Sequence, residues 1–130
     1  MTRPATGLRV LVADDDPQLR RLIGRLLERR GYAVASAADG EEALRRFRED
    51  PQAIGVVVLD AALAPGGAAE VLAEMAKVRP DLGVVFTSGD ALPPAQRACL
   101  VAHDGVFLRK PFDPEALLRA VEDSRVREQV

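Results

Sequence analysis

The chain has 130 residues, of which 48% are hydrophobic and 29% charged, a composition that is ordinary for one globular domain. Its formal net charge of -2 and its scattered basic residues argue against a nucleic-acid-binding face. No stretch approaches the ~20 apolar residues of a membrane span, and the first seven residues lack the apolar core of a signal peptide. The single cysteine, Cys99, fits a reducing compartment. We therefore expect one cytoplasmic domain over residues 1–130, with its core at about 8–126, and no direct contact with nucleic acid or membrane.

Short apolar runs that predict strands occur along the whole chain. They fall at about 8–14, 32–37, 54–60, 82–88 and 105–109. The first, third and fourth runs are almost continuously apolar, which is typical of parallel strands that are buried on both faces. The run from Tyr32 to Ala37 is less apolar and could therefore lie at an edge of the sheet.

A helical pattern follows each of these strands. Gly31 ends the first pattern, and the second begins at Asp39, with acidic residues in its first turn. The fifth begins with Asp113 as N-cap and Pro114 as its first residue. The fourth, at about 94–103, offers only small residues to the core. The expected buried faces are, in chain order, Leu19, Leu22, Ile23, Leu26 and Leu27; Ala43, Leu44 and Phe47; Val71, Leu72 and Met75; Ala95, Ala98, Cys99 and Ala102; and Leu117, Leu118 and Val121.

Five such βα units predict an α/β fold with a doubly wound, flavodoxin-like (βα)5 topology and a five-stranded parallel sheet of order 2-1-3-4-5. Ligands of such sheets bind beyond the carboxyl ends of the strands, at the topological switch point. Reactive side chains end four of the predicted strands. They are Asp14 and Asp15 after the first strand, Asp60 after the third, Ser88 after the fourth and Lys110 after the fifth.

The chemistry of these groups favours phosphoryl transfer. Clustered carboxylates raise one another's pKa unless a cation neutralises them, and Mg²⁺ prefers oxygen ligands of this kind. The carboxylate of Asp60 could act as a nucleophile toward phosphorus and form an aspartyl phosphate. Mg²⁺, Lys110 and the Ser88 hydroxyl would each take one phosphoryl oxygen, because such transfer needs mainly positioning and charge neutralisation. Each residue alone would be an ordinary turn or surface residue, so the prediction depends on their joint order.

Four segments of the chain resemble the receiver domain of two-component response regulators. The segments are Val-Ala-Asp14-Asp15-Asp16-Pro17, Val-Val-Leu-Asp60, Phe-Thr-Ser88-Gly89 and Phe107-Leu-Arg-Lys110-Pro111-Phe112. The resemblance extends from about Leu8 to Val126. It implies that Asp60 accepts a phosphoryl group from the phosphohistidine of a histidine kinase or a histidine phosphotransfer protein. It also implies a phosphorelay component without an output domain, either free-standing or part of a longer protein, whose kinase, signal and target the sequence does not name.

The resemblance further implies Mg²⁺ as the cofactor. Asp15 and Asp60 would bind the ion directly, Asp14 would bind it partly through water, and the backbone carbonyl of Ala62 would be a further ligand. Such a domain promotes its own phosphorylation and dephosphorylation and is not a separate enzyme.

Two residues match the switch positions of the family, Ser88 as the hydroxyl and Phe107 as the aromatic residue. Phosphorylation is therefore expected to change the face formed by the fourth helix, the fifth strand and the fifth helix. The resemblance also implies a cis peptide bond between Lys110 and Pro111.

The segment after Asp60 departs from the family pattern. The family usually has a proline four residues after the acceptor and then Gly, Asp and Gly, whereas here Pro65 is five residues on and Gly66-Gly67-Ala68-Ala69 follows. We therefore expect the loop from Asp60 to Ala69 either to take a different path or to be looser.

Three other classes of protein share parts of this pattern. A pseudo-receiver would be an interaction module that is never phosphorylated, but the chain has all five site residues. A magnesium-dependent phosphatase with an aspartyl nucleophile would place a second acid two residues on, where this chain has Ala62. A flavodoxin-like electron carrier would need hydroxyls and backbone amides in the first loop, which is acidic here.

Overall fold

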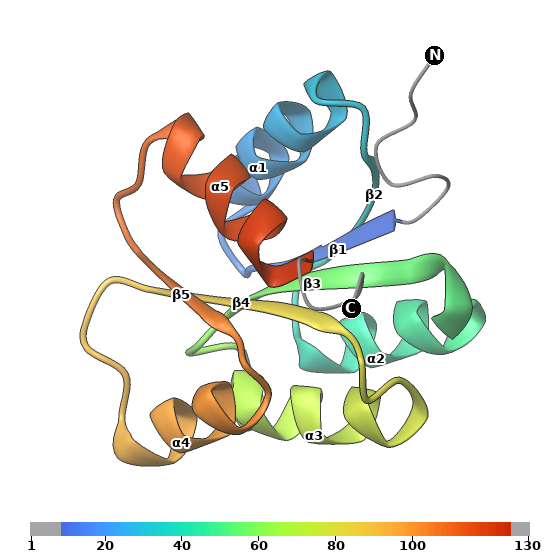
Figure 1. Cartoon of the computed structure of the whole chain (residues 1–130), viewed down its shortest axis with the longest axis vertical. Coiled ribbons are helices and arrows are strands. Elements are labelled where there is room, and N and C mark those ends of the chain that lie inside the picture. Colours follow the sequence, from blue (N-terminus) through green and yellow to red (C-terminus); the bar gives the residue numbers. More distant parts are fainter. Residues whose placement is uncertain (1–8, 126–130) are drawn as a thin grey trace.

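The computed structural model describes residues 9–125, which form a parallel sheet flanked by helices (Figure 1). Leu8 and Val126, at the ends of the expected core, lie outside the described residues. The strands are β1 (Arg9–Ala13), β2 (Ala33–Ala37), β3 (Ile54–Asp60), β4 (Gly83–Ser88) and β5 (Val106–Arg109). The helices are α1 (Pro17–Arg29), α2 (Gly40–Glu49), α3 (Ala68–Val78), α4 (Pro94–Ala102) and α5 (Pro114–Arg125), with a short 3-10 helix, Pro51–Ala53, before β3.

The strands lie in the order β2-β1-β3-β4-β5 and all pair in parallel, which confirms the predicted topology. The central strand β3 is buried along its whole length because helices cover both faces of the sheet. The less apolar strand β2 lies at an edge, as its composition suggested, and exposes Ala33 and Ser36. The order leaves β1 and β3 as neighbours whose helices depart on opposite sides, so the switch point lies between them.

The helices form two layers around the sheet. In Figure 1, α1 and α5 cover one face, and α2, α3 and α4 cover the other. Each layer has its own hydrophobic cluster, and β3 contributes Val56 and Val58 to one and Val57 and Leu59 to the other. Burial of each large aliphatic side chain contributes about 1.5–3 kcal/mol. Within residues 9–125, no helix is long and apolar enough to cross a bilayer.

Aspartate caps fix where several helices begin. The side chains of Asp16, Asp39 and Asp113 each accept a hydrogen bond from a first-turn amide, at 3.0, 2.8 and 2.8 Å. Glu42 in turn accepts from the amide of Ala38, the residue before the cap, at 2.7 Å and so ties the entering chain to the start of α2. The caps confirm the predicted starts at Asp39 and Asp113, and the cap at Asp16 starts α1 two residues beyond Asp14.

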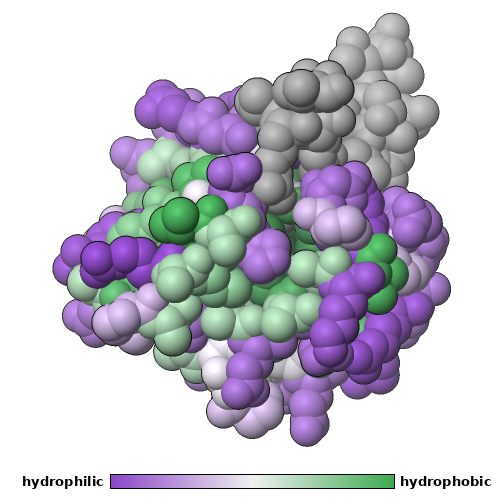
Figure 2. Space-filling view, turned by 60° about the horizontal axis from the view of Figure 1, so that its bottom comes forward, coloured by the Kyte–Doolittle hydropathy of each residue, from purple (hydrophilic) through white to green (hydrophobic). Residues whose placement is uncertain are grey.

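The buried face of α4 differs from the one expected. Ala95, Ala98 and Ala102 are exposed and Cys99 is half-buried, whereas Leu100 is only 5% exposed and packs into the core. Leucine removes more apolar area from water than alanine does, so the helix turns Leu100 inward and leaves the alanines outside. Figure 2 turns the side of α2, α3 and α4 toward the viewer and shows an apolar area across its middle, between hydrophilic margins.

Candidate functional site

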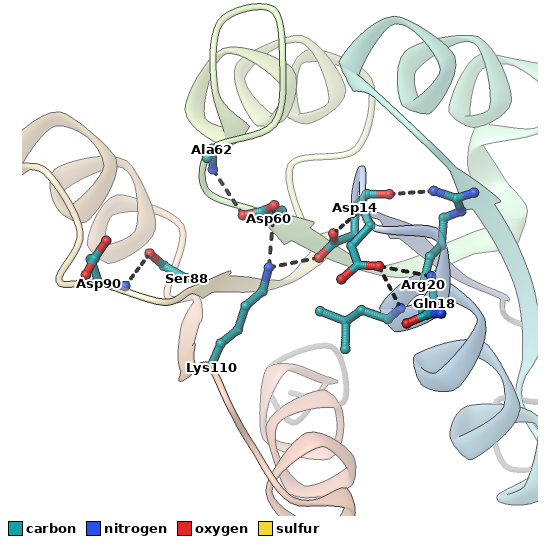
Figure 3. A network of polar contacts seen from close by, with 10 residues as sticks. Asp14, Gln18, Arg20, Asp60, Ala62, Ser88, Asp90 and Lys110 are labelled. Atoms are coloured by element: carbon teal, nitrogen blue, oxygen red, sulfur yellow. Dashed lines mark hydrogen bonds and ion pairs between the residues drawn. The ribbon is translucent and has the colours of Figure 1, made fainter.

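The carboxyl ends of β1, β3 and β5 bring three of the predicted side chains together (Figure 3). Asp14 follows β1, Asp60 ends β3 and Lys110 follows β5. The Nζ atom of Lys110 lies 3.0 Å from Oδ2 of Asp14 and 3.5 Å from Oδ2 of Asp60. One ammonium group therefore bridges two carboxylates that are far apart in the sequence.

Asp14, Asp15 and Asp60 form the predicted acidic cluster. One carboxylate oxygen of each lies within 4.8 Å of those of the other two. Asp14 is 2% exposed and Asp60 8% exposed, whereas Asp15 faces solvent. The three negative charges and the positive charge of Lys110 leave a net charge of -2. A set of hard oxygen donors with this charge fits a divalent cation such as Mg²⁺, and Asp15 leaves the cluster open to solvent.

Backbone contacts hold the two buried carboxylates in place. Oδ1 of Asp14 accepts from the amide of Asp16 at 2.9 Å, and Oδ1 of Asp60 accepts from the amide of Ala62 at 3.2 Å. The guanidinium of Arg20 donates to the backbone carbonyl of Asp14 at 2.7 Å. Sequence reasoning did not find Arg20, because nothing in the pattern separates it from the other arginines of α1. The amide of Ala62 lies at the site, and the role of its carbonyl stays a prediction.

The charge state of Lys110 reflects its two acidic neighbours. Burial by itself would lower the pKa of Lys110. The hydrogen bond to Asp14 and the charges of Asp14 and Asp60 outweigh burial, so the pKa lies above the ordinary lysine value. Lys110 is therefore fully protonated at neutral pH and supplies a fixed positive charge at this end of the sheet.

The two predicted switch residues lie on β4 and β5. Ser88 ends β4, and its carbonyl accepts the amide of Lys110 at 2.8 Å. Its hydroxyl accepts a hydrogen bond from the amide of Asp90 at 3.1 Å and so points toward the loop before α4 (Figure 3). Phe107 on β5 is 38% exposed. The neighbouring hydroxyl, that of Thr87, is buried, so Ser88 carries the accessible hydroxyl at this strand end.

Two cis peptide bonds and a hydrogen-bonded turn lie in the loops around the site. The Lys110–Pro111 peptide bond is cis, which confirms the prediction, and the Ala64–Pro65 bond is cis as well. The loop after Asp60 is a hydrogen-bonded turn, in which the amide of Leu63 donates to the Asp60 carbonyl at 3.0 Å. Whether this loop takes a different path from that of the family or is looser stays a prediction.

Known proteins match this arrangement. A model of the response regulator receiver domain family matches residues 10–122. The transcriptional regulatory protein GlrR of Escherichia coli K12 is 34% identical over 118 residues, which are 88% of this chain and 26% of GlrR. The chain thus spans about a quarter of the length of this relative.

Solved structures agree with the sequence comparisons. A receiver domain protein of Clostridium thermocellum superposes with a TM-score of 0.81 at 29% identity, covering 94% of this chain and 97% of that one. A response regulator of Burkholderia pseudomallei, solved with a phosphorylated aspartic acid, a calcium ion and citrate, superposes with a TM-score of 0.77 at 27% identity, covering 94% and 71%.

Proposed function

We propose that this chain, which belongs to the response regulator receiver domain family, accepts a phosphoryl group on Asp60 from a phosphohistidine donor. The observation that carries the proposal is the position of Asp60, an almost buried carboxylate at a strand end, 3.5 Å from the Lys110 ammonium and beside two further carboxylates. The phosphorylated aspartic acid of the Burkholderia pseudomallei regulator supports the same modification here.

The transfer requires one nucleophile and groups that hold negative charge. A carboxylate oxygen of Asp60 forms the new P–O bond while the P–N bond to the donor imidazole breaks, and the electron pair of that bond returns to the imidazole nitrogen. A carboxylate nucleophile needs no general base, because it has no proton to lose. Lys110 would stabilise the charge that develops on the phosphoryl oxygens. The Ser88 hydroxyl would leave Asp90 to bind another of these oxygens.

A divalent cation completes the charge balance of the site. Asp15 and Asp60 would bind Mg²⁺ directly, with Asp14 and the carbonyl of Ala62 as further ligands, and the ion would neutralise one phosphoryl oxygen. The acidic cluster supports this assignment because its oxygens lie close together and carry more charge than Lys110 balances. Without a cation these carboxylates repel one another, so the ion should also stabilise the fold.

The donor is proposed to be a histidine kinase or a histidine phosphotransfer protein that docks beside Lys110. An apolar groove of about 540 Å³ borders Lys110, between Leu19, Leu22 and Leu26 of α1 and Phe112 in the loop before α5. Leu22, which was expected on the buried face of the first helix, is half exposed there. A protein that brings a phosphohistidine to Asp60 has to cover this end of the sheet, so the groove can receive an apolar ridge of the donor.

The proposed output is a change of the face that contains α4, β5 and α5. This face exposes Phe107, and Val101 of α4 is 70% exposed, so a partner could read it. That residues 1–130 form one receiver domain stays a prediction, as does the cytoplasmic location. The activity and the partners of the whole protein are proposals as well, because the chain spans only about a quarter of the length of GlrR.

Phosphoryl uptake from acetyl phosphate tests the acceptor function. We expect the intact mass of the wild-type protein to rise by one phosphoryl group only with Mg²⁺ present. Asp60→Asn should take up none, and Asp90→Asn, which removes an exposed acid of the next loop, should behave as wild type. No uptake by the wild-type protein would favour the pseudo-receiver alternative.

The donor groove is tested by comparing two donors. Leu22→Ser should slow transfer from a phosphorylated histidine phosphotransfer protein by roughly tenfold, which corresponds to about 1.4 kcal/mol. Its effect on uptake from acetyl phosphate should be far smaller, because a small donor needs no docking surface. Equal slowing with both donors would contradict the role of the groove.

A further inference from the structure

A side chain of α4 joins the phosphoacceptor loop to that helix. Gln96 lies in the first turn of α4, and its Nε2 donates to the carbonyl of Ala61 at 2.9 Å. Its Oε1 accepts from the amide of Ala69 at 3.0 Å. Ala61 directly follows Asp60, and Ala69 is the second residue of α3. One amide group therefore binds both ends of the β3–α3 loop.

The contact with Ala69 acts as a helix cap. The first amides of a helix have no partner within the helix, and the N-cap of α3, Gly67, has no side chain to supply one. Gln96 of another helix accepts the amide of Ala69 instead. The cap of α3 is thus provided by α4.

Gly67 makes room for this contact. Its φ of +91° lies in the region that favours glycine, and a Cβ placed there would be 2.5 Å from Nε2 of Gln96 and 3.3 Å from the carbonyl oxygen of Ala61. Gly67 belongs to the segment that departs from the family pattern. It is therefore the residue of that segment that lets Gln96 approach the loop.

Apart from Gln96, α4 packs against the core through Leu100 and the half-buried Cys99. Leu100 is its only buried residue within the described part of the chain, and its N-cap, Pro93, makes no side-chain cap hydrogen bond. The two hydrogen bonds of Gln96 are thus a large part of what holds the first turn of α4 against the molecule. These two hydrogen bonds are therefore a direct connection between the loop after Asp60 and α4.

We infer that Gln96 is a positioning residue that holds the loop after Asp60 in place and couples it to α4. This inference rests on the proposed function, because the signal that it would carry is the phosphoryl group on Asp60. The route differs from the one through Ser88 and Phe107, since it starts from the backbone of Ala61. Coupling of this kind requires that the loop and the helix have arrangements that depend on each other.

Hydrogen exchange of the ligand-free protein tests the contacts themselves. Gln96→Leu removes both hydrogen bonds and should speed exchange of the Ala69 amide, and of the first amides within α4, by roughly tenfold or more. Gln96→Glu keeps an acceptor for Ala69 but places a carboxylate against the Ala61 carbonyl. It should protect Ala69 and still loosen α4. The control Arg97→Leu changes an exposed neighbour on the same helix and should alter neither region. Unchanged exchange in Gln96→Leu would overturn the inference.

Beryllofluoride, a phosphoryl mimic, tests the coupling. In the wild-type protein and in Arg97→Leu it should change exchange both beside Asp60 and along α4. In Gln96→Leu the change beside Asp60 should persist and the change along α4 should fall by at least half. A full α4 response in Gln96→Leu would reduce Gln96 to a cap of α3 and overturn the coupling. If beryllofluoride caused no response beside Asp60 in the wild type, the proposed function would be contradicted instead. The inference about Gln96 would then be judged by the exchange of α4 in ligand-free Gln96→Leu.

Discussion

Lys110 and Asp14 form a close ion pair at the end of the sheet, with Nζ of Lys110 3.0 Å from Oδ2 of Asp14. Asp14 follows β1 and Lys110 follows β5, and β3 and β4 separate these two strands in the sheet. The same Nζ atom lies 3.5 Å from Oδ2 of Asp60, which ends β3. The ammonium group therefore contacts both buried carboxylates of the site.

We expect Lys110→Gln to lower both phosphoryl uptake and stability. The substitution leaves the buried carboxylate of Asp14 without its cation, which should cost roughly 1–3 kcal/mol in the absence of Mg²⁺. The other lysine of the chain, Lys77, pairs with Glu74 at 3.0 Å on the surface, where such pairs contribute about 0–1 kcal/mol. Urea unfolding of Lys110→Gln and Lys77→Gln compares the two sites directly. Equal losses of unfolding free energy in the two variants would show that the Lys110–Asp14 pair stabilises the fold no more than the surface pair does.

The raised pKa of Lys110 gives stability a defined dependence on pH. Its stabilising effect is fully present below the pKa of an unfolded lysine, about 10.4, and is lost as pH rises through the higher folded value. The difference in unfolding free energy between wild type and Lys110→Gln should therefore stay constant from about pH 7 to 9 and shrink above about 10.4. Unfolding curves over this range measure it. A difference that already shrinks near neutral pH would contradict the assigned charge state.

Mg²⁺ should raise the melting temperature of the wild-type protein through the acidic cluster. A ligand at about 100 times its Kd stabilises the folded state by about 2.7 kcal/mol. Asp15→Asn should reduce the shift because it removes one of the three clustered carboxylates. Asp16→Asn is the matched control, because it removes one negative charge from the residue next to Asp15. The cap of α1 should persist, since asparagine caps a helix as well as aspartate does. Equal shifts in both variants would place the ion elsewhere.

The hydroxyl of Ser88 should be needed for the change at Phe107. With beryllofluoride bound, exchange around Phe107 should change in the wild type and in Thr87→Val, because Thr87 is buried. The same change should be lost in Ser88→Ala. That variant should stay within about 1.5 kcal/mol of wild-type stability, since it loses one hydrogen bond, to Asp90. A Thr87→Val variant that loses the response would assign the switch to Thr87.

The site was predictable from the sequence because strand ends are predictable. The apolar runs before Asp14 and Asp60 define buried parallel strands, and a shorter run before Lys110 defines the partly exposed edge strand β5. The fold then places the carboxyl ends of these strands at the same edge of the sheet. The family resemblance added the cis bond before Pro111, which no local pattern indicates.

The contacts of α4 were not predictable in the same way. An alanine-rich helix has no strong apolar face, so its rotation about its axis depends on how Leu100 and Gln96 meet the rest of the fold. A lone glutamine in such a helix is typical of a solvated surface. Arg20 was missed for the same reason, since its contact with the Asp14 carbonyl depends on the geometry of the turn between β1 and α1.

The position of the phosphoryl group tests the central claim most directly. The protein is incubated with acetyl phosphate and Mg²⁺, the acyl phosphate is reduced with borohydride to fix its place, and the modified residue is read from peptide masses. We predict modification at Asp60 alone, with none in Asp60→Asn. A modification at Asp14 or Asp15, or full labelling of Asp60→Asn, would contradict the account.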